Sequence, residues 1–114
     1  MHELSIAQNI ISIVQENLNT EQRNAVKKVR VKVGKLTNIL VDSLVFGFEA
    51  LTKDTNLDGV TLEVENIPLT IQCQDCKETS TLDDYIFSCP GCHSTAITLV
   101  SGNELMVSEI ELND

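Results

Sequence analysis

The sequence predicts an α+β fold: a small three-stranded antiparallel sheet backed by two helices, with a four-cysteine domain inserted before the last strand. Two segments place apolar residues at helical spacing, three segments alternate apolar and polar residues, and two CxxC pairs stand between the second and third alternating segments. With 114 residues, 42% of them hydrophobic, the chain can bury one core. We therefore assign residues 1–70 plus 100–114 to one discontinuous domain and residues 71–99 to the inserted domain.

The first predicted helix lies within residues 3–18, where apolar residues recur at intervals of three and four. The residues of this face are Leu4, Ala7, Ile11, Val14 and Leu18. The second predicted helix lies within residues 41–55, where Asp42 or Ser43 is suited to be the N-cap and Gly47 weakens the helix slightly. Its apolar stripe consists of Leu44, Val45, Phe48 and Leu51.

The three alternating segments predict the strands. The first strand ends at Gly34, and the second is the stretch VTLEVENI at residues 60–67. Their inward residues are Val29, Val31 and Val33 in the first and Val60, Leu62 and Val64 in the second. The third strand, NELMVSEIEL at residues 103–112, has to return to the first sheet to bury Leu105, Val107 or Ile110.

Positive charge is concentrated around the first strand. The formal net charge is −9, yet residues 20–36 carry +5. Lys28, Arg30 and Lys32 alternate with the inward valines, and this face is either solvated or docks an acidic partner. The net acidity argues against nucleic acid as the principal partner, because phosphate contacts require clustered Lys and Arg.

The four cysteines form the strongest motif, CQDC followed twelve residues later by CPGC. Each CxxC pair folds into a tight knuckle that presents two thiolates, and two facing knuckles complete the tetrahedron that zinc prefers. The spacing suits a zinc ribbon with a short hairpin, and Gly91 suits a positive φ in the second knuckle. The alternative is a thioredoxin-like redox pair, which the symmetric spacing and the missing parallel βαβ pattern oppose.

The sequence shows no apolar run near the ~20 residues of a membrane span and no secretory signal within its first twenty residues. We therefore expect a cytoplasmic protein that binds no membrane and is a monomer or weak homodimer. Cysteines in such a reducing compartment serve as metal ligands more often than as disulfides.

The opening stretch MHELS is either an ordinary helix start or part of a second metal site. The Met1 amine, the adjacent amide nitrogen and the His2 imidazole can reach one ion together and form fused chelate rings. Nitrogen-rich donors in square-planar or tetragonal geometry select Ni(II) or Cu(II). The residues alone leave both interpretations open.

Three stretches together resemble the HypA/HybF family of hydrogenase nickel-insertion accessory proteins: the start MHELSIAQNI, the VGKL strand end leading into SLVFGFEAL, and the late CQDC and CPGCHS pairs. The resemblance spans nearly the whole chain. It implies a small sheet backed by two helices, with a zinc domain inserted before the last strand. It also implies Ni²⁺ binding by His2, with Glu3 and the Met1 amine in support. Structural Zn²⁺ would be held by Cys73, Cys76, Cys89 and Cys92.

The activity that this resemblance implies is that of a nickel metallochaperone, which hands Ni²⁺ to a [NiFe] hydrogenase precursor alongside a nickel-delivery GTPase. It implies no enzyme. The residues agree, because the chain has only two histidines and no nucleophile–base set remains once zinc takes the cysteines. The rival interpretation is a zinc-ribbon module for protein–protein interaction with no nickel role.

Two positions depart from the family pattern. Some members carry an acidic residue just before the second helix, where this chain has Leu40, with Asp42 two positions later. Some members follow both CxxC pairs with His, whereas here Lys77 follows the first pair and His93 the second. Four thiolates already fill a zinc tetrahedron, so we expect His93 to be solvated or to lie beside the ligands.

Overall fold

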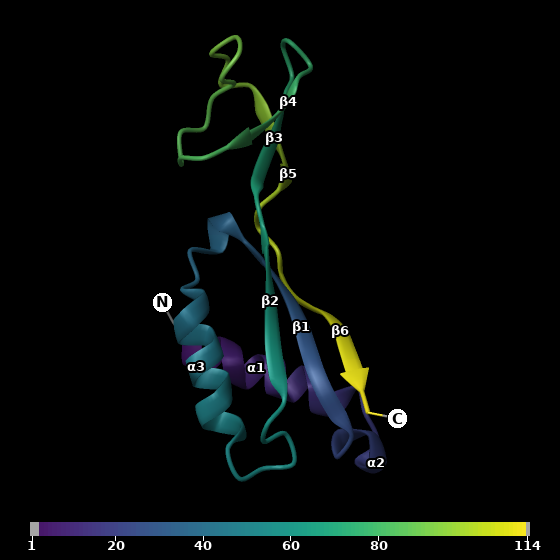
Figure 1. The fold of residues 1–114 in the computed structure, drawn as a ribbon. Coiled ribbons are helices and arrows are strands. Elements are labelled where there is room, and N and C mark those ends of the chain that lie inside the picture. The colour runs from purple at the N-terminus through teal and green to yellow at the C-terminus, as the bar shows by residue number, and fades with distance from the viewer. Residues whose placement is uncertain (1–2, 114) are drawn as a thin grey trace.

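The computed structural model describes residues 3–113 and has an elongated shape, with extents of 54 × 26 × 18 Å. Two three-stranded sheets, ordered β2-β1-β6 and β4-β3-β5, lie at opposite ends of the long axis (Figure 1). The helices are α1 (Glu3–Glu16), α2 (Thr20–Arg23), the 3₁₀ helix η1 (Lys35–Thr37) and α3 (Val41–Thr52). The strands are β1 (Val26–Gly34), β2 (Thr61–Ile67), β3 (Leu69–Cys73), β4 (Thr79–Leu82), β5 (Ile97–Ser101) and β6 (Leu105–Leu112).

The α+β class and the insertion before the last strand are confirmed, but the first sheet is mixed rather than antiparallel. β1 pairs with β6 antiparallel, as predicted, and with β2 parallel, with Val29 opposite Leu62. The reason is the connection between them. Helix α3 lies between β1 and β2 in the chain, and a strand–helix–strand crossover returns the second strand in the direction of the first.

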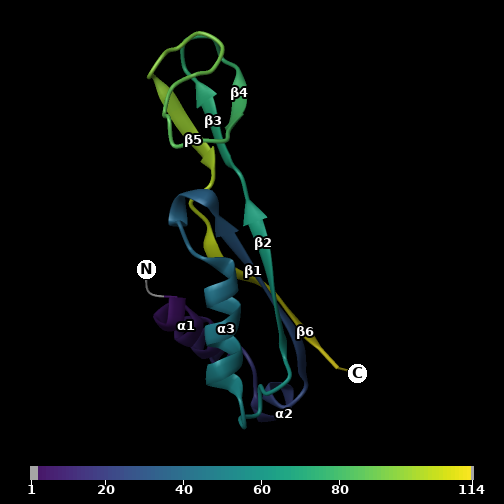
Figure 2. The ribbon, with the colours of Figure 1, turned by 60° about the vertical axis from the view of Figure 1, so that its left-hand side comes forward.

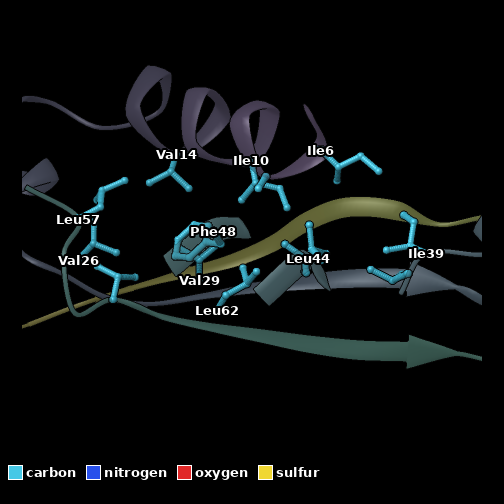
Figure 3. Packing of buried hydrophobic residues seen from close by; sticks show 14 residues of the cluster. Ile6, Ile10, Val14, Val26, Val29, Ile39, Leu44, Phe48, Leu57 and Leu62 are labelled. Atoms are coloured by element: carbon cyan, nitrogen blue, oxygen red, sulfur yellow. The ribbon is translucent and has the colours of Figure 1, made fainter. Parts of the chain in front are cut away.

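The main core lies between the first sheet and the two long helices, which cover one face of that sheet (Figures 1 and 2). The predicted inward valines Val29, Val31 and Val33 are all buried. Leu44 and Phe48 of α3 belong to the same cluster, in which Figure 3 shows them near Val29. In the part of the chain that the structure describes, no helix is long and apolar enough to cross a membrane.

The buried face of α1 differs from the predicted stripe. Its buried residues are Ile6, Ala7, Ile10 and Val14, and Leu4 is 53% exposed. Both stripes are apolar, and packing against α3 and the sheet selects between them. Gly47, expected to weaken α3, faces α1 in this packing, and a Cβ there would make ordinary van der Waals contacts, 3.4 Å from Leu4 Cδ1 and 3.8 Å from Ala7 Cβ.

Helix α3 begins earlier than predicted. Its N-cap is Leu40, and Asp42 lies inside its first turn, so the expected N-cap at Asp42 or Ser43 is wrong. Within the described chain, Leu40 makes no side-chain capping hydrogen bond. Instead the Leu40 N–H donates to Glu3 Oε2 at the start of α1, over 3.1 Å.

The second sheet has its own small cluster, formed by Leu69, Ile71 and Leu82, to which Leu36 of η1 contributes from the first part of the chain. The link to the first sheet is tight, because a Cβ on Gly34 would lie 2.1 Å from the carbonyl oxygen of Gly102. The two sheets are therefore joined by packed backbone as well as by the two chain crossings.

Polar contacts fasten the same junction. Lys35 Nζ donates to the carbonyl oxygens of Leu82 and Asp83, and its ammonium lies 5.6 Å from the centre of the Tyr85 ring. The Tyr85 hydroxyl donates to the Lys35 carbonyl oxygen over 3.0 Å. The loop that leads from β4 to the second CxxC pair is thus tied to the segment between β1 and α3.

Two of the three basic residues on the predicted basic face of β1 form ion pairs within the first sheet. Lys28 Nζ lies 3.1 Å from a Glu63 carboxylate oxygen, and the Arg30 guanidinium lies 3.2 Å from carboxylate oxygens of Glu63 and Glu109. The Lys28 hydrogen bond, with the nearby Arg30 charge, holds the pKa of Glu63 below its usual value. Acidic partners for Lys28 and Arg30 are therefore supplied by β2 and β6, which favours the solvated interpretation of this face.

Candidate metal centre

The four cysteines come together at the far end of the second sheet. The Sγ atoms of the four cysteines all lie within 4.8 Å of one another; the residues are Cys73, Cys76, Cys89 and Cys92. The Sγ atoms of Cys73 and Cys92 are 3.5 Å apart, and those of Cys76 and Cys89 are 3.6 Å apart. Four sulfurs at ~2.3 Å from one zinc ion would be separated by ~3.8 Å. The cluster therefore fits a tetrahedral structural zinc ion with little rearrangement.

Two knuckles of matching geometry position these sulfurs. Lys77 N–H donates to the Cys73 carbonyl oxygen over 3.0 Å, and His93 N–H donates to the Cys89 carbonyl oxygen over 2.9 Å. Both residues have positive φ, 68° at Lys77 and 63° at His93. The turn therefore closes at the residue after each CxxC pair, and the positive φ predicted for Gly91 is wrong.

Backbone hydrogen bonds anchor each knuckle. Cys73 N–H donates to the Glu78 carbonyl oxygen over 2.9 Å, and Cys89 N–H donates to the Ser94 carbonyl oxygen over 2.8 Å. The Ser94 hydroxyl also donates to the Asp75 carboxylate, which lies in the first knuckle. Both knuckles are thus tied to each other as well as closed individually, which presets the four-sulfur geometry.

The pKa values of the cysteine thiols show that a bound cation would stabilise the cluster. The Cys76 and Asp75 amides hold the pKa of the Cys73 thiol low, at about 6, because they stabilise its thiolate. The Glu78 amide acts on Cys76 in the same direction, but desolvation and the neighbouring thiols outweigh it and raise the pKa of Cys76 to about 12. One thiolate therefore suppresses ionisation of the other thiols. A bound divalent cation offsets the repulsion between the thiolates and lets all four ionise.

The described part of the N-terminal candidate site is Glu3. Met1 and His2, the other predicted nickel ligands, lie outside the described residues. Glu3 opens α1, and its carboxylate accepts the hydrogen bond from Leu40 N–H at the start of α3. The starts of α1 and α3 lie close together in both ribbon views (Figures 1 and 2). The exposed His93 is not among the grouped metal-ligating side chains of residues 3–113.

The sequence did not predict two contacts, one at the candidate nickel site and one at the junction between the two sheets. At position 40 only the side chain was considered as a possible ligand. The main-chain N–H of Leu40 donates a hydrogen bond to Glu3, and no sequence signal marks that donor. The Lys35–Tyr85 junction was also missed. Tyr85 is the single tyrosine of the chain and stands among the acidic and apolar residues of DDYIFS, an unusual setting that could have drawn attention to it.

The family model for HypA, described as a hydrogenase/urease nickel incorporation metallochaperone, matches residues 1–112. This chain belongs to the HypA family. Among relatives named hydrogenase maturation factor HypA, that of Lawsonia intracellularis is 37% identical over 117 residues, covering 98% of this chain and 99% of its own. The relative from Desulfatibacillum aliphaticivorans is 42% identical over 115 residues and covers 100% of this chain and 88% of its own.

Two solved structures support the fold of this HypA-family chain. The solution structure of the Ni metallochaperone HypA from Helicobacter pylori matches with a TM-score of 0.65 at 22% identity, covering 99% of this chain and 98% of that one. A second solution structure of HypA protein matches with a TM-score of 0.69 at 22% identity, covering 98% and 96%. The overall fold of this chain is thus shared with known members of the family.

Proposed function

We propose that this chain is a nickel metallochaperone that binds Ni²⁺ at its N-terminus and delivers it to a [NiFe] hydrogenase precursor. The observation that carries the proposal is the family match, which runs from residue 1 to residue 112 and therefore includes the opening MHE. The relatives named hydrogenase maturation factor support hydrogenase as the destination. A zinc-ribbon module without a nickel role has no comparable support.

The proposed nickel ligands are His2, Glu3 and the Met1 amine. Imidazole and amine nitrogens suit Ni²⁺, and the nearby Glu3 adds an oxygen donor. Such a site can release its ion, because its donors belong to the chain end and to the first residue of α1. Glu3 already lies beside the start of α3, so one donor is held in place before the metal arrives.

The proposed zinc ligands are Cys73, Cys76, Cys89 and Cys92. Four thiolates saturate a tetrahedral ion, so this site stabilises the fold and leaves no position for a substrate. We therefore propose no enzymatic activity. The chain then divides into a nickel-binding unit, residues 1–70 plus 100–114, and a zinc ribbon, residues 71–99.

The proposed partners are a nickel-delivery GTPase of the hydrogenase maturation system and the hydrogenase large-subunit precursor. The nickel incorporation role described for the family supports the recipient, since incorporation requires one. The GTPase is proposed from the resemblance of the opening stretch and the two CxxC pairs to the family. The cytoplasm is the proposed location, because the four cysteines must remain reduced to serve as thiolate ligands. We propose that the protein works there as a monomer or weak homodimer.

Calorimetric titration of Ni²⁺ into zinc-loaded, untagged protein tests the function. Wild type should bind one ion tightly, and His2→Ala should lose that binding while its zinc content and thermal unfolding stay unchanged. Affinity should fall as pH drops from about 8 to 6, because the α-amine and the imidazole, with reference pKa values of ~7.7–8.0 and ~6.5, must both lose protons. Equal affinities for wild type and His2→Ala would refute the N-terminal site.

A further inference from the structure

The start of α3 receives its hydrogen-bond acceptor from another helix. An α-helix leaves its first N–H groups without partners, and a side chain at the N-cap commonly satisfies one of them. Here the N-cap is Leu40, whose side chain cannot accept a hydrogen bond and is 64% exposed. The carboxylate of Glu3, 37 residues earlier in the chain, accepts from the Leu40 N–H over 3.1 Å.

Packing between the two helices makes this contact possible. Gly47 of α3 faces Leu4, the residue next to Glu3, and the close approach of the two helices there brings Glu3 to the start of α3. The positive end of the α3 dipole also attracts the carboxylate. Glu3 is therefore oriented by a donor that is fixed in the backbone and needs no side-chain ordering of its own.

We propose that the backbone N–H of Leu40 positions Glu3 for nickel binding, so that position 40 serves the metal site through its main chain. The inference rests on the proposed nickel function and assigns a positioning role to a residue whose side chain cannot ligate a metal. A carboxylate already held beside the chain start loses less conformational freedom when the ion binds. The amide thus raises nickel affinity without touching the ion.

Proline at position 40 removes this donor selectively. Leu40 has φ −81°, which is close to the value that proline imposes, and its N–H makes no bond within α3. Its carbonyl oxygen, which accepts from Leu44 N–H, is retained. Leu40→Ala is the matched variant, because it truncates the side chain and keeps the N–H.

The decisive measurement is the nickel dissociation constant of zinc-loaded, untagged Leu40→Pro and Leu40→Ala. We expect Leu40→Pro to bind Ni²⁺ about five-fold more weakly than Leu40→Ala, a modest factor because the hydrogen bond is solvent-exposed. Circular dichroism of both variants must show intact helices. Equal affinities, or tighter binding by Leu40→Pro, would overturn the positioning role, and tighter binding would mean that the amide competes with nickel for Glu3.

Glu3 variants test the contact without nickel and without proline. Glutamine at position 3 can still accept from the Leu40 N–H, whereas alanine cannot. Hydrogen exchange of the Leu40 amide in nickel-free protein should therefore be faster in Glu3→Ala than in Glu3→Gln. Similar exchange in both would overturn the inference. If His2→Ala binds nickel like wild type while this exchange difference persists, the nickel function fails and the contact itself stands.

Discussion

Loss of zinc should unfold the ribbon and leave the helical core folded. The second sheet buries three apolar side chains, Leu69, Ile71 and Leu82, which contribute about 1.5–3 kcal/mol each. A structural zinc ion contributes about 10–16 kcal/mol in small zinc domains. The metal is therefore the larger contribution, and Cys73→Ala or zinc chelation should remove the ribbon's main source of stability.

Hydrogen exchange resolved by peptide measures this outcome. Residues near 70–100 should lose protection, including the Cys73 and Cys89 amides that close the two knuckles. The 14 residues of the main buried cluster do not involve the cysteines, so α1 and α3 should keep their protection. Unchanged exchange in the ribbon after verified zinc loss would refute the reasoning.

A matched variant separates ligand loss from disturbance of the knuckle. Lys77 holds a positive φ of 68°, which costs a residue with a side chain roughly 1 kcal/mol and costs glycine little. Lys77→Gly should therefore retain zinc and be at least as stable as wild type. Zinc loss in Lys77→Gly would mean that its side chain, and not only its backbone turn, supports the site.

Three further outcomes are expected. Gly34→Ala should destabilise the fold by more than about 1 kcal/mol in chemical denaturation, because its Cβ would lie 2.1 Å from the carbonyl oxygen of Gly102. The control variant Gly47→Ala should be neutral or stabilise α3 by up to ~1 kcal/mol. Glu63 has a lowered pKa in the folded protein, so its carboxylate stabilises the fold above its unfolded pKa and loses that contribution as pH falls. Glu63→Gln should therefore lose less stability than wild type when the pH drops below ~5. Tyr85→Phe should loosen the ribbon relative to the helices, measured by residual dipolar couplings, with little change in melting temperature. Equal stability of Gly34→Ala and Gly47→Ala would contradict the first expectation. A pH dependence of stability in Glu63→Gln equal to that of wild type would contradict the second, and an unchanged orientation of the ribbon relative to the helices in Tyr85→Phe would contradict the third.

Local patterns predicted the parts of this fold that local physics decides. The alternation of Val29, Val31 and Val33 correctly predicted which side of β1 is buried. The two CxxC pairs predicted two knuckles and the close approach of their four sulfur atoms. Tertiary contacts decided the rest. Ile6 and Ile10 are buried on α1, Ile11 of the predicted stripe is only partly buried and Leu4 is exposed, although either stripe is apolar enough to be buried.

Strand direction and the capping of α3 were missed for a related reason. The parallel β1–β2 pair follows from the path of the chain through α3, which residue alternation does not encode. The hydrogen bond from Leu40 to Glu3 joins residues far apart in the sequence, and one partner is a backbone group that every residue except proline carries. Neither feature has a local signature.

The zinc ribbon and the proposed nickel site differ in how easily they can release an ion. In the ribbon, each knuckle is closed by backbone hydrogen bonds at Cys73 and Cys89, and the knuckles are joined through Ser94 and Asp75. Removing a thiolate there means opening a turn that the fold has already closed. Glu3 is instead the first residue of α1, and its carboxylate accepts an exposed hydrogen bond from the Leu40 N–H. An ion bound beside Glu3 can leave without breaking either core, so release from the chain start is compatible with a ribbon that keeps its zinc.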